Sequence, residues 1–168
     1  MAPPRGTRPV SDRAREGLFS SLGTAVAGAD CLDLFAGSGA LGIEALSLGA
    51  DSCTFVDKAR PAAAAIARNL SRTHLDERAT VVVRDARSFV QQPPARPVDL
   101  AFVDPPYEVA GPALDRVFDA LEASWLREQR WTVVVTRGHR SSLPAVPLHW
   151  SARRQLRYGD SLVILYGP

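Results

Sequence analysis

The fold is decided by the stretch ADCLDLFAGSGALG, residues 29–42. Its apolar first half predicts a buried strand over residues 29–36, and a helix is predicted over residues 40–48. Between them, residues 37–42 form the pattern G-x-G-x-x-G, in which glycines allow a tight turn and a close approach of the backbone to a ligand at a helix N-terminus. A strand that leads through such a loop into a helix indicates an α/β fold with a ligand site at the loop.

The alternation of strand and helix continues along the chain. Further strands are predicted over residues 52–56, 79–83, 98–103 and 131–136, with helices over residues 62–70, 88–91 and 113–123. Strands joined by helices run parallel, and the helices cover both faces of the sheet. Residues 153–158 and 161–166 flank Gly159-Asp160 and predict an antiparallel hairpin. The sequence therefore predicts an α/β protein with a mostly parallel, seven-stranded sheet, helices on both faces and a C-terminal antiparallel hairpin.

The length and composition fit a single soluble domain. The chain has 168 residues, of which 46% are hydrophobic and 23% charged, which suits one core rather than two full domains. No apolar run approaches the about 20 residues that span a bilayer, and residues 1–9 lack the apolar core of a signal peptide. Cys31 and Cys53 fall in apolar surroundings and are expected to be reduced thiols. We therefore expect a cytoplasmic protein without membrane contact.

The net charge of +2 conceals an uneven distribution. Residues 1–27 contain four arginines against two acids, residues 28–128 contain ten basic against fifteen acidic residues, and residues 129–168 contain six arginines against one aspartate. This segregation predicts an acidic catalytic core between basic, anion-binding ends. We divide the chain into residues 1–28, a basic segment with a capping helix, and residues 29–168, the catalytic part of a single domain.

Acidic residues stand at the ends of successive predicted strands, where parallel strands bind ligands. Asp33 lies in the first strand, where a carboxylate would repel a pyrophosphate but suits a cation such as an α-ammonium group. Asp57 ends the second strand and can accept both hydroxyls of a ribose, and Asp85, followed by Ala86, can accept the amine of adenine. Singly, each aspartate also fits a solvated loop acid or a helix cap. Together, ammonium, ribose and adenine describe S-adenosylmethionine better than NAD.

The most specific signal is Asp104-Pro105-Pro106-Tyr107, directly after the fourth predicted strand. The exocyclic amine of a nucleobase is a poor nucleophile because its lone pair is delocalised into the ring. The Asp104 carboxylate and the Pro105 carbonyl can accept its hydrogens, and the prolines hold these acceptors in place. Tyr107 offers a ring on which a base taken out of its helix can stack. The motif predicts methyl transfer to an amine without a metal, and the proton leaves either to Asp104 or to water.

These motifs make the chain similar to the class I, S-adenosylmethionine-dependent methyltransferases, which have a Rossmann-like fold. More closely, it resembles the RsmD family, which methylates a guanine N2 amine in 16S ribosomal RNA. The resemblance is carried by RPVSDRAREGLF (8–19), LDLFAGSGALG (32–42), FVD (55–57), DPPY (104–107) and YGD (158–160). The segment 8–19 narrows the choice, because DNA amino-methyltransferases generally lack it. Family members usually carry a glycine-rich, basic hairpin before this segment, whereas this chain starts almost directly at it.

The resemblance implies a role for each motif, to which the charge distribution adds the C-terminal arginines. Residues expected to bind the cofactor S-adenosyl-L-methionine are Asp33, Phe35, Ala36, Gly37, Ser38, Gly39, Asp57, Lys58, Asp85 and Ala86. The expected catalytic residues, which hold the guanine amine, are Asp104, Pro105, Pro106 and Tyr107. The expected RNA contacts are Arg5, Arg8, Arg13, Arg15, Arg153, Arg154 and Arg157. The implied partner is 16S rRNA in the small ribosomal subunit or its assembly intermediate, and we expect a monomer without a metal site.

Two other functions are compatible with the sequence. An amino-methyltransferase acting on DNA, tRNA or a protein would use the same DPPY site at residues 104–107. A non-catalytic ribosome-assembly factor with a vestigial cofactor pocket would share the fold, although a vestigial pocket need not keep the aspartates and the DPPY motif. Methylation assays on RNA, small subunits and DNA distinguish these functions.

Overall fold

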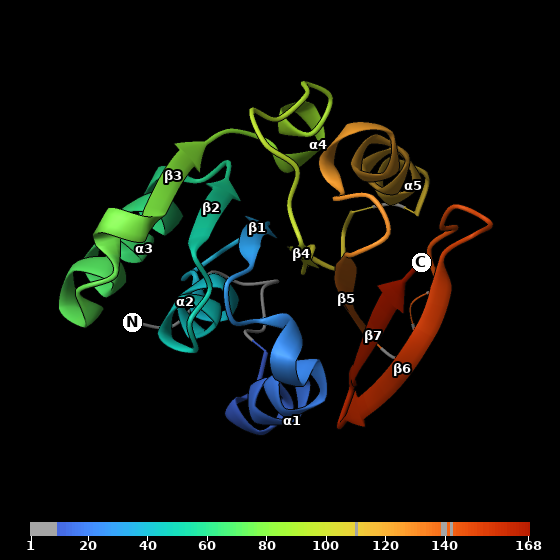
Figure 1. Ribbon diagram of the computed structural model, residues 1–168, viewed down its shortest axis with the longest axis horizontal. Helices are drawn as coiled ribbons and strands as arrows, with labels where there is room; N and C mark the ends of the chain where they lie inside the picture. The colour runs from blue at the N-terminus through green and yellow to red at the C-terminus, as the bar shows by residue number, and fades with distance from the viewer. Residues whose placement is uncertain (1–9, 110, 139–140, 142) are drawn as a thin grey trace.

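The computed structural model describes residues 10–109, 111–138, 141 and 143–168. Its centre is a seven-stranded sheet with the strand order β3-β2-β1-β4-β5-β7-β6 (Figure 1). The strands are β1 (Asp30–Leu34), β2 (Ser52–Asp57), β3 (Ala79–Val83), β4 (Leu100–Val103), β5 (Thr132–Gly138), β6 (Ser151–Tyr158) and β7 (Ser161–Gly167). Strands β1 to β5 pair in parallel, whereas β7 pairs antiparallel with β5 and β6. The predicted sheet and its C-terminal hairpin are confirmed.

Helices cover both faces of the sheet, as predicted. They are α1 (Asp12–Leu22), α2 (Ala40–Ser47), α3 (Arg60–Thr73), α4 (Ala86–Phe89) and α5 (Gly111–Ala120), with 3-10 turns at Gly23–Ala25 and Asp76–Arg78 and a π turn at Leu121–Trp125. The core under α1, α2 and α3 includes Leu18, Leu41 and Ile66. The core under α4 and α5 includes Val90 and Phe118. No helix in the described ranges is long and apolar enough to cross a bilayer.

Two predicted boundaries move for identifiable physical reasons. The short helix predicted over residues 88–91 is α4, which begins at Ala86 because the Asp85 carboxylate accepts the Arg87 N–H at 2.8 Å and caps it. The strand predicted from residue 98 begins at Leu100, because Val98 forms only an isolated bridge with the segment after the π turn. The remaining elements lie within a few residues of their predicted limits.

Helix α1 packs beside the C-terminal hairpin. It begins after Ser11, whose Oγ accepts the Ala14 N–H at 3.1 Å. The helix packs on strand β6 at Gly17, where a Cβ would lie 1.6 Å from the Tyr158 hydroxyl. The absence of a side chain at Gly17 therefore makes room for Tyr158, and α1 lies beside the C-terminal hairpin (Figure 1).

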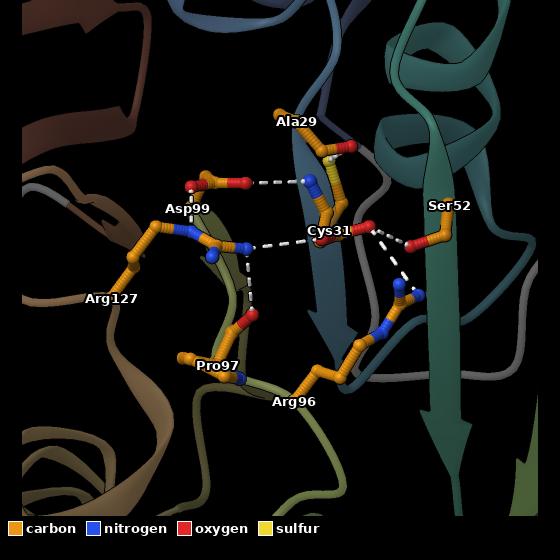
Figure 2. A network of polar contacts seen from close by, with 8 residues as sticks. Ala29, Cys31, Ser52, Arg96, Pro97, Asp99 and Arg127 are labelled. Carbon is orange, nitrogen blue, oxygen red and sulfur yellow. Dashed lines mark hydrogen bonds and ion pairs between the residues drawn. The ribbon is translucent and has the colours of Figure 1, made fainter.

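The amino-terminal edge of the sheet is held by a polar network around Arg127 (Figure 2). Arg127 Nε donates to Asp99 Oδ1 at 2.5 Å, and its Nη2 donates to Asp30 Oδ2 at 3.1 Å. Asp99 Oδ2 also accepts the Asp30 N–H at 2.9 Å, and Ser52 Oγ donates to Asp30 Oδ1 at 2.7 Å. The network thereby fixes the starts of β1, β2 and β4 against the loop before β5.

We expect the substitution Arg127→Met to lower the melting temperature by several degrees, because it removes donors from two carboxylates that begin neighbouring strands. Arg96→Met is the matched control. Arg96 approaches Asp30 Oδ1 only at 3.7 Å and its side chain is 73% exposed, so its removal should leave the melting temperature nearly unchanged. Thermal unfolding followed by circular dichroism measures both variants. Equal melting temperatures for the two would contradict a stabilising role for Arg127.

Candidate active site

The glycine loop that follows β1 adopts a backbone that favours glycine. Gly37 and Gly39 have φ angles of 58° and 80°, in the left-handed region where a side chain is strained. Gly42 lies where a Cβ would come within 2.4 Å of the Phe55 ring. Its missing side chain therefore allows α2 to pack closely on β2. The predicted role of Gly37 and Gly39 as loop residues is consistent with this geometry, whereas the packing role of Gly42 was not predicted.

Asp33 lies beneath this loop with only 1% of its surface exposed. Its Oδ2 accepts the Gly42 N–H at 3.0 Å, so the carboxylate caps α2 from within the sheet, where Gly39 has no side chain to do so. Burial raises the pKa of Asp33 well above its ordinary value; the Gly42 hydrogen bond opposes this rise, and the charges of Asp104 and Asp57 add to it. The capping bond was not foreseen from the sequence, and the role of Asp33 toward an ammonium group stays a prediction.

Asp57, at the end of β2, connects to the glycine loop. Its Oδ2 accepts the Gly37 N–H and its Oδ1 accepts the Ala59 N–H, both at 2.9 Å. These bonds fix the orientation of the carboxylate, and each oxygen keeps acceptor capacity for a further donor. The structure therefore brings the ends of β1 and β2 together at one edge, as the sequence predicts. Lys58, the next residue, is exposed.

Asp85, at the start of α4, is engaged by its own helix. Arg87 Nη2 donates to Asp85 Oδ2 at 2.8 Å and Arg87 Nε donates to Oδ1 at 3.1 Å. The hydrogen bonds and the charge of Arg87 lower the pKa of Asp85 to about 2. Asp85 is therefore ionised, but any adenine amine would share its oxygens with Arg87. Ala86 is buried in the first turn of the helix. The signal for this pairing in the sequence is an arginine two residues after the acid.

The other residues expected to bind the cofactor surround the glycine loop. Phe35 and Ala36 are half-buried after β1, and Phe35 has a φ of 56°, which is uncommon for a residue with a side chain. Ser38 is exposed, and its carbonyl accepts a hydrogen bond from Asn69 Nδ2 at 3.0 Å. Asn69, on α3, was not predicted as part of the site. Its amide braces the loop from the neighbouring helix.

The segment from Asp104 to Tyr107 leaves β4 at the same edge of the sheet. Burial raises the pKa of Asp104 to about 7, Pro105 is buried, and Tyr107 is 44% exposed. A Cβ at Gly138, the last residue of β5, would lie 2.8 Å from Tyr107 Cε1. The Tyr107 ring therefore rests against the end of β5 and keeps nearly half of its surface open. Gly138 is a site residue that the sequence did not reveal, except as a glycine that follows the strand predicted over residues 131–136.

The electrostatics of this edge favour a positively charged ligand. The charges of Asp57 and Asp104 both raise the pKa of Asp33, so the three carboxylates lie within electrostatic reach of one another. Such a cluster repels a pyrophosphate and attracts an ammonium or sulfonium group. The residues present at the edge therefore fit S-adenosylmethionine, which contains both kinds of cation.

The raised pKa of Asp104 predicts how activity depends on pH. Below a pH of about 7 the carboxyl is protonated and loses acceptor capacity, whereas above it the carboxylate can accept from an amine. We expect kcat/KM to rise as the pH increases through about 7 and then to level off. Initial rates at saturating cofactor from about pH 5 to 9 measure this profile. A rate that stays level over this whole range, as expected for a carboxyl with the ordinary pKa of 3.8, would contradict the role of burial.

The same shift predicts an opposite dependence for stability. The pKa of Asp104 is higher in the folded than in the unfolded protein, so the folded state binds more protons between the two values. Its contribution to stability therefore falls as the pH rises from about 4 to about 7. We expect Asp104→Asn to raise the free energy of unfolding at alkaline pH by roughly 2–3 kcal/mol, less than the full shift implies because part of the side chain is exposed. Urea unfolding at about pH 5 and about pH 8 checks the sign.

The N-terminal arginines expected to contact RNA are only partly described. Arg5 and Arg8 lie outside the described residues. Arg13 is exposed on α1. Arg15, on the same helix, forms an ion pair with Asp12 in which Nη2 and Oδ1 are 2.9 Å apart. The charge of Arg15 is thus partly balanced by an acid of its own helix.

The C-terminal arginines lie on the edge strand β6, where all three are exposed. Arg154 is on the α1 face of the sheet and Arg157 is on the α5 face, as their pairing with β7 shows. Arg153 lies at a register irregularity of β6 and donates to the backbone oxygen of Pro168. Because α1 packs beside β6, the structure places arginines from both ends of the chain on neighbouring elements (Figure 1).

Known proteins resemble this chain over almost its full length. The family model described as "Conserved hypothetical protein 95" matches residues 1–167. Ribosomal RNA small subunit methyltransferase D of Escherichia coli strain K12 is 38% identical over 162 residues, covering 96% of this chain and 79% of that protein. The protein of the same name from Haemophilus influenzae is 32% identical, covering 96% and 83%.

The fold agrees with this relationship. The solved structure of yhhF from Escherichia coli superposes with a TM-score of 0.85 at 36% identity, covering 99% of this chain and 90% of that one. The resemblance that the sequence motifs indicated, and the Rossmann-like methyltransferase fold that it implied, are both confirmed. The chain belongs to the RsmD family, whose curated relatives are named ribosomal RNA small subunit methyltransferase D.

Proposed function

We propose that this protein transfers a methyl group from S-adenosyl-L-methionine to the N2 amine of a guanine in 16S ribosomal RNA. The observation that carries the proposal is the site at Asp104-Tyr107, with a largely buried carboxylate, a proline-fixed carbonyl and a half-open aromatic ring. The names of the relatives support a small-subunit rRNA substrate. The protein would act as a monomer in the cytoplasm, on the small subunit or its assembly intermediate.

Residues at the ends of β1, β2 and β3 would hold the cofactor. Gly37 and Ser38 are exposed residues of the loop, and the oriented Asp57 carboxylate suits the hydroxyls of a ribose. Asp85 stands at the end of β3, on the side expected for the adenine amine. When bound, S-adenosylmethionine supplies an electrophilic methyl group attached to a sulfonium sulfur.

The chain's own contribution to the reaction is made at the amine of the substrate. Asp104 accepts one hydrogen of this amine and the Pro105 carbonyl accepts the other, which directs the nitrogen lone pair out of the plane of the base. Positive charge that develops on the nitrogen is then stabilised by a carboxylate in a partly desolvated site. As the nitrogen–carbon bond forms, the nitrogen must lose a proton. A pKa of about 7 enables Asp104 to take it at neutral pH.

The predicted RNA surface is continuous with this site. Gly138, against which Tyr107 rests, pairs with Ser161, and Ser161 pairs with Tyr158 at the end of β6. Tyr158 in turn fits against Gly17 of α1. The carboxyl end of β5, the end of β6 and the middle of α1 therefore form one neighbourhood. A nucleotide held at Tyr107 would have its flanking phosphates near exposed arginines of α1 and β6.

We expect Arg154→Gln combined with Arg157→Gln to weaken RNA binding and to reduce its salt dependence. Loss of two phosphate contacts should make the negative slope of log K against log salt concentration less steep by about 2. Arg153→Gln should have a smaller effect, because Arg153 already donates to Pro168. Arg130→Gln is the matched control, since this exposed arginine precedes the opposite end of β5. Titrations of 16S rRNA at several salt concentrations give the slopes. An unchanged slope in the double variant would remove β6 from the RNA surface.

Labelled cofactor tests the proposal against its alternatives. Methyl transfer should be measured with naked 16S rRNA, with small subunits that lack the modification, with tRNA and with DNA. We expect label in 16S rRNA, either naked or within the subunit. Label in DNA or tRNA alone would contradict the proposal. Tight binding to the subunit with no label in any substrate would favour an assembly factor.

A further inference from the structure

Buried side-chain polar atoms without a hydrogen-bond partner occur in the described chain on two adjacent residues, whose side chains point to opposite faces of the sheet because Thr136 pairs with Val163 and Arg137 with Leu162. They are Oγ1 of Thr136 and Nε and Nη1 of Arg137, adjacent residues near the carboxyl end of β5. Thr136 is only 7% exposed and Arg137 only 6%. A buried donor without an acceptor is costly, and a desolvated guanidinium is costlier still. Unpartnered groups of this kind in a native structure require an explanation, and a ligand that supplies the acceptor is one.

The register of the sheet places these residues beside the proposed catalytic segment. Strands β4 and β5 pair in parallel up to Val103 and Val135. The next residues along the two strands are Asp104 and Thr136. One step further on β5 is Arg137, two residues beyond the last pair of β4 and β5. The unpartnered donors thus lie at the edge where the amine of the substrate is expected.

The neighbours of Arg137 on β5 and β7 define its surroundings. Gly138, which follows it, contacts the Tyr107 ring. Leu162, its partner on β7, belongs to the core under α5, so the Arg137 side chain is on the α5 face of the sheet. Leu162 also pairs with the exposed Arg157 of β6 on the same face. The row from Arg157 to Arg137 therefore leads from the proposed RNA surface to a buried cation at the end of β5, one residue before the glycine against which Tyr107 rests.

We propose that Arg137 recognises the target base by donating hydrogen bonds to O6 and N7 of the guanine. This inference rests on the proposed function. A guanidinium has only donors and stays charged, so its ligand must offer acceptors. Guanine presents O6 and N7 as acceptors, a pair that arginine binds well, whereas adenine carries a donor amine at position 6. The buried position at the end of β5, the strand end against which Tyr107 rests, favours the base, while the exposed arginines of β6 suit phosphates.

The test compares two bases and two residues. Small subunits are reconstituted with 16S rRNA in which the mapped target guanine is replaced by 2,6-diaminopurine, which keeps the N2 amine but has an amine in place of O6. For the unsubstituted protein we expect kcat/KM to fall by about tenfold or more on this replacement. For Arg137→Met we expect a low kcat/KM with guanine and almost no difference between the two bases. Arg130→Met, at the other end of β5, should keep the full difference.

A purely structural role for Arg137 predicts another pattern. If Arg137 serves recognition and not stability, Arg137→Met should melt at the same or a higher temperature, because methionine has a similar volume without the buried charge. A lower melting temperature with unchanged discrimination between the bases would overturn the inference. Evidence that Arg137 binds a phosphate would also overturn it. In that case the effect of Arg137→Met on kcat/KM would disappear when the phosphate 5′ to the target is replaced by an uncharged methylphosphonate. If the unsubstituted protein does not methylate the guanine substrate, the proposed function fails instead.

Discussion

Replacement of Asp104 by alanine is expected to lower kcat by about 100- to 1,000-fold while the Kd of S-adenosylmethionine changes little. The carboxylate lies at the end of β4, in a site that raises its pKa to about 7 by desolvation. A charge acceptor in such a site stabilises developing positive charge more strongly than it would in water. Because it acts on the amine of the substrate, its removal should affect the chemical step and not the binding of the cofactor.

Single-turnover rates and cofactor titrations separate these two effects. Asp119→Ala is the matched control, because Asp119 is an exposed aspartate on α5 and its removal should change neither quantity. A variant Asp104→Ala that binds cofactor about tenfold more weakly but turns over normally once loaded would refute the assigned role.

Replacement of Asp57 by alanine is expected to have the reverse effect, raising the Kd of S-adenosylmethionine by about 10- to 100-fold with a smaller change in kcat. The substitution removes the acceptor proposed for the ribose. It also removes the bond from Gly37 that ties the glycine loop to the end of β2. Loss of one charged hydrogen-bond acceptor and of loop order both weaken binding of the cofactor.

Isothermal titration calorimetry measures the affinity of this variant directly. Asp51→Ala provides the control, since Asp51 is exposed just before β2 and lies at the other end of the strand. Asp57→Asn should bind with intermediate affinity, because the amide keeps one acceptor oxygen and places a donor toward one of the two N–H groups. Unchanged affinity in Asp57→Ala would exclude Asp57 from the cofactor site.

The features that the sequence predicted correctly depend on local pattern. The apolar run before Gly37 predicted β1, and alternation of strand and helix predicted a parallel sheet whose ends meet at one edge. The hydrogen bond from Gly37 to Asp57 joins two of these ends, although the residues are twenty positions apart. Chain connectivity of an α/β sheet leaves few alternatives to this arrangement, so the edge was predictable without coordinates.

The features that were not predicted depend on packing between distant segments. The capping of α2 by Asp33 requires the carboxylate to point under the loop, and nothing in the local pattern specifies this. The contact of Gly138 with Tyr107 requires the register of β4 and β5. Arg137 was one of several arginines in the sequence, and only its burial and lack of partners distinguish it.

The central claim is that the edge formed by Asp104 and Tyr107 methylates a guanine N2 amine of 16S rRNA. Its most direct test is to react unmethylated small subunits with the protein and cofactor, digest the RNA, and identify the methylated nucleoside by mass spectrometry. We expect N2-methylguanosine at one position of 16S rRNA, and its absence when Asp104→Ala replaces the unsubstituted protein. A methyl group on another base atom or on a ribose would contradict it.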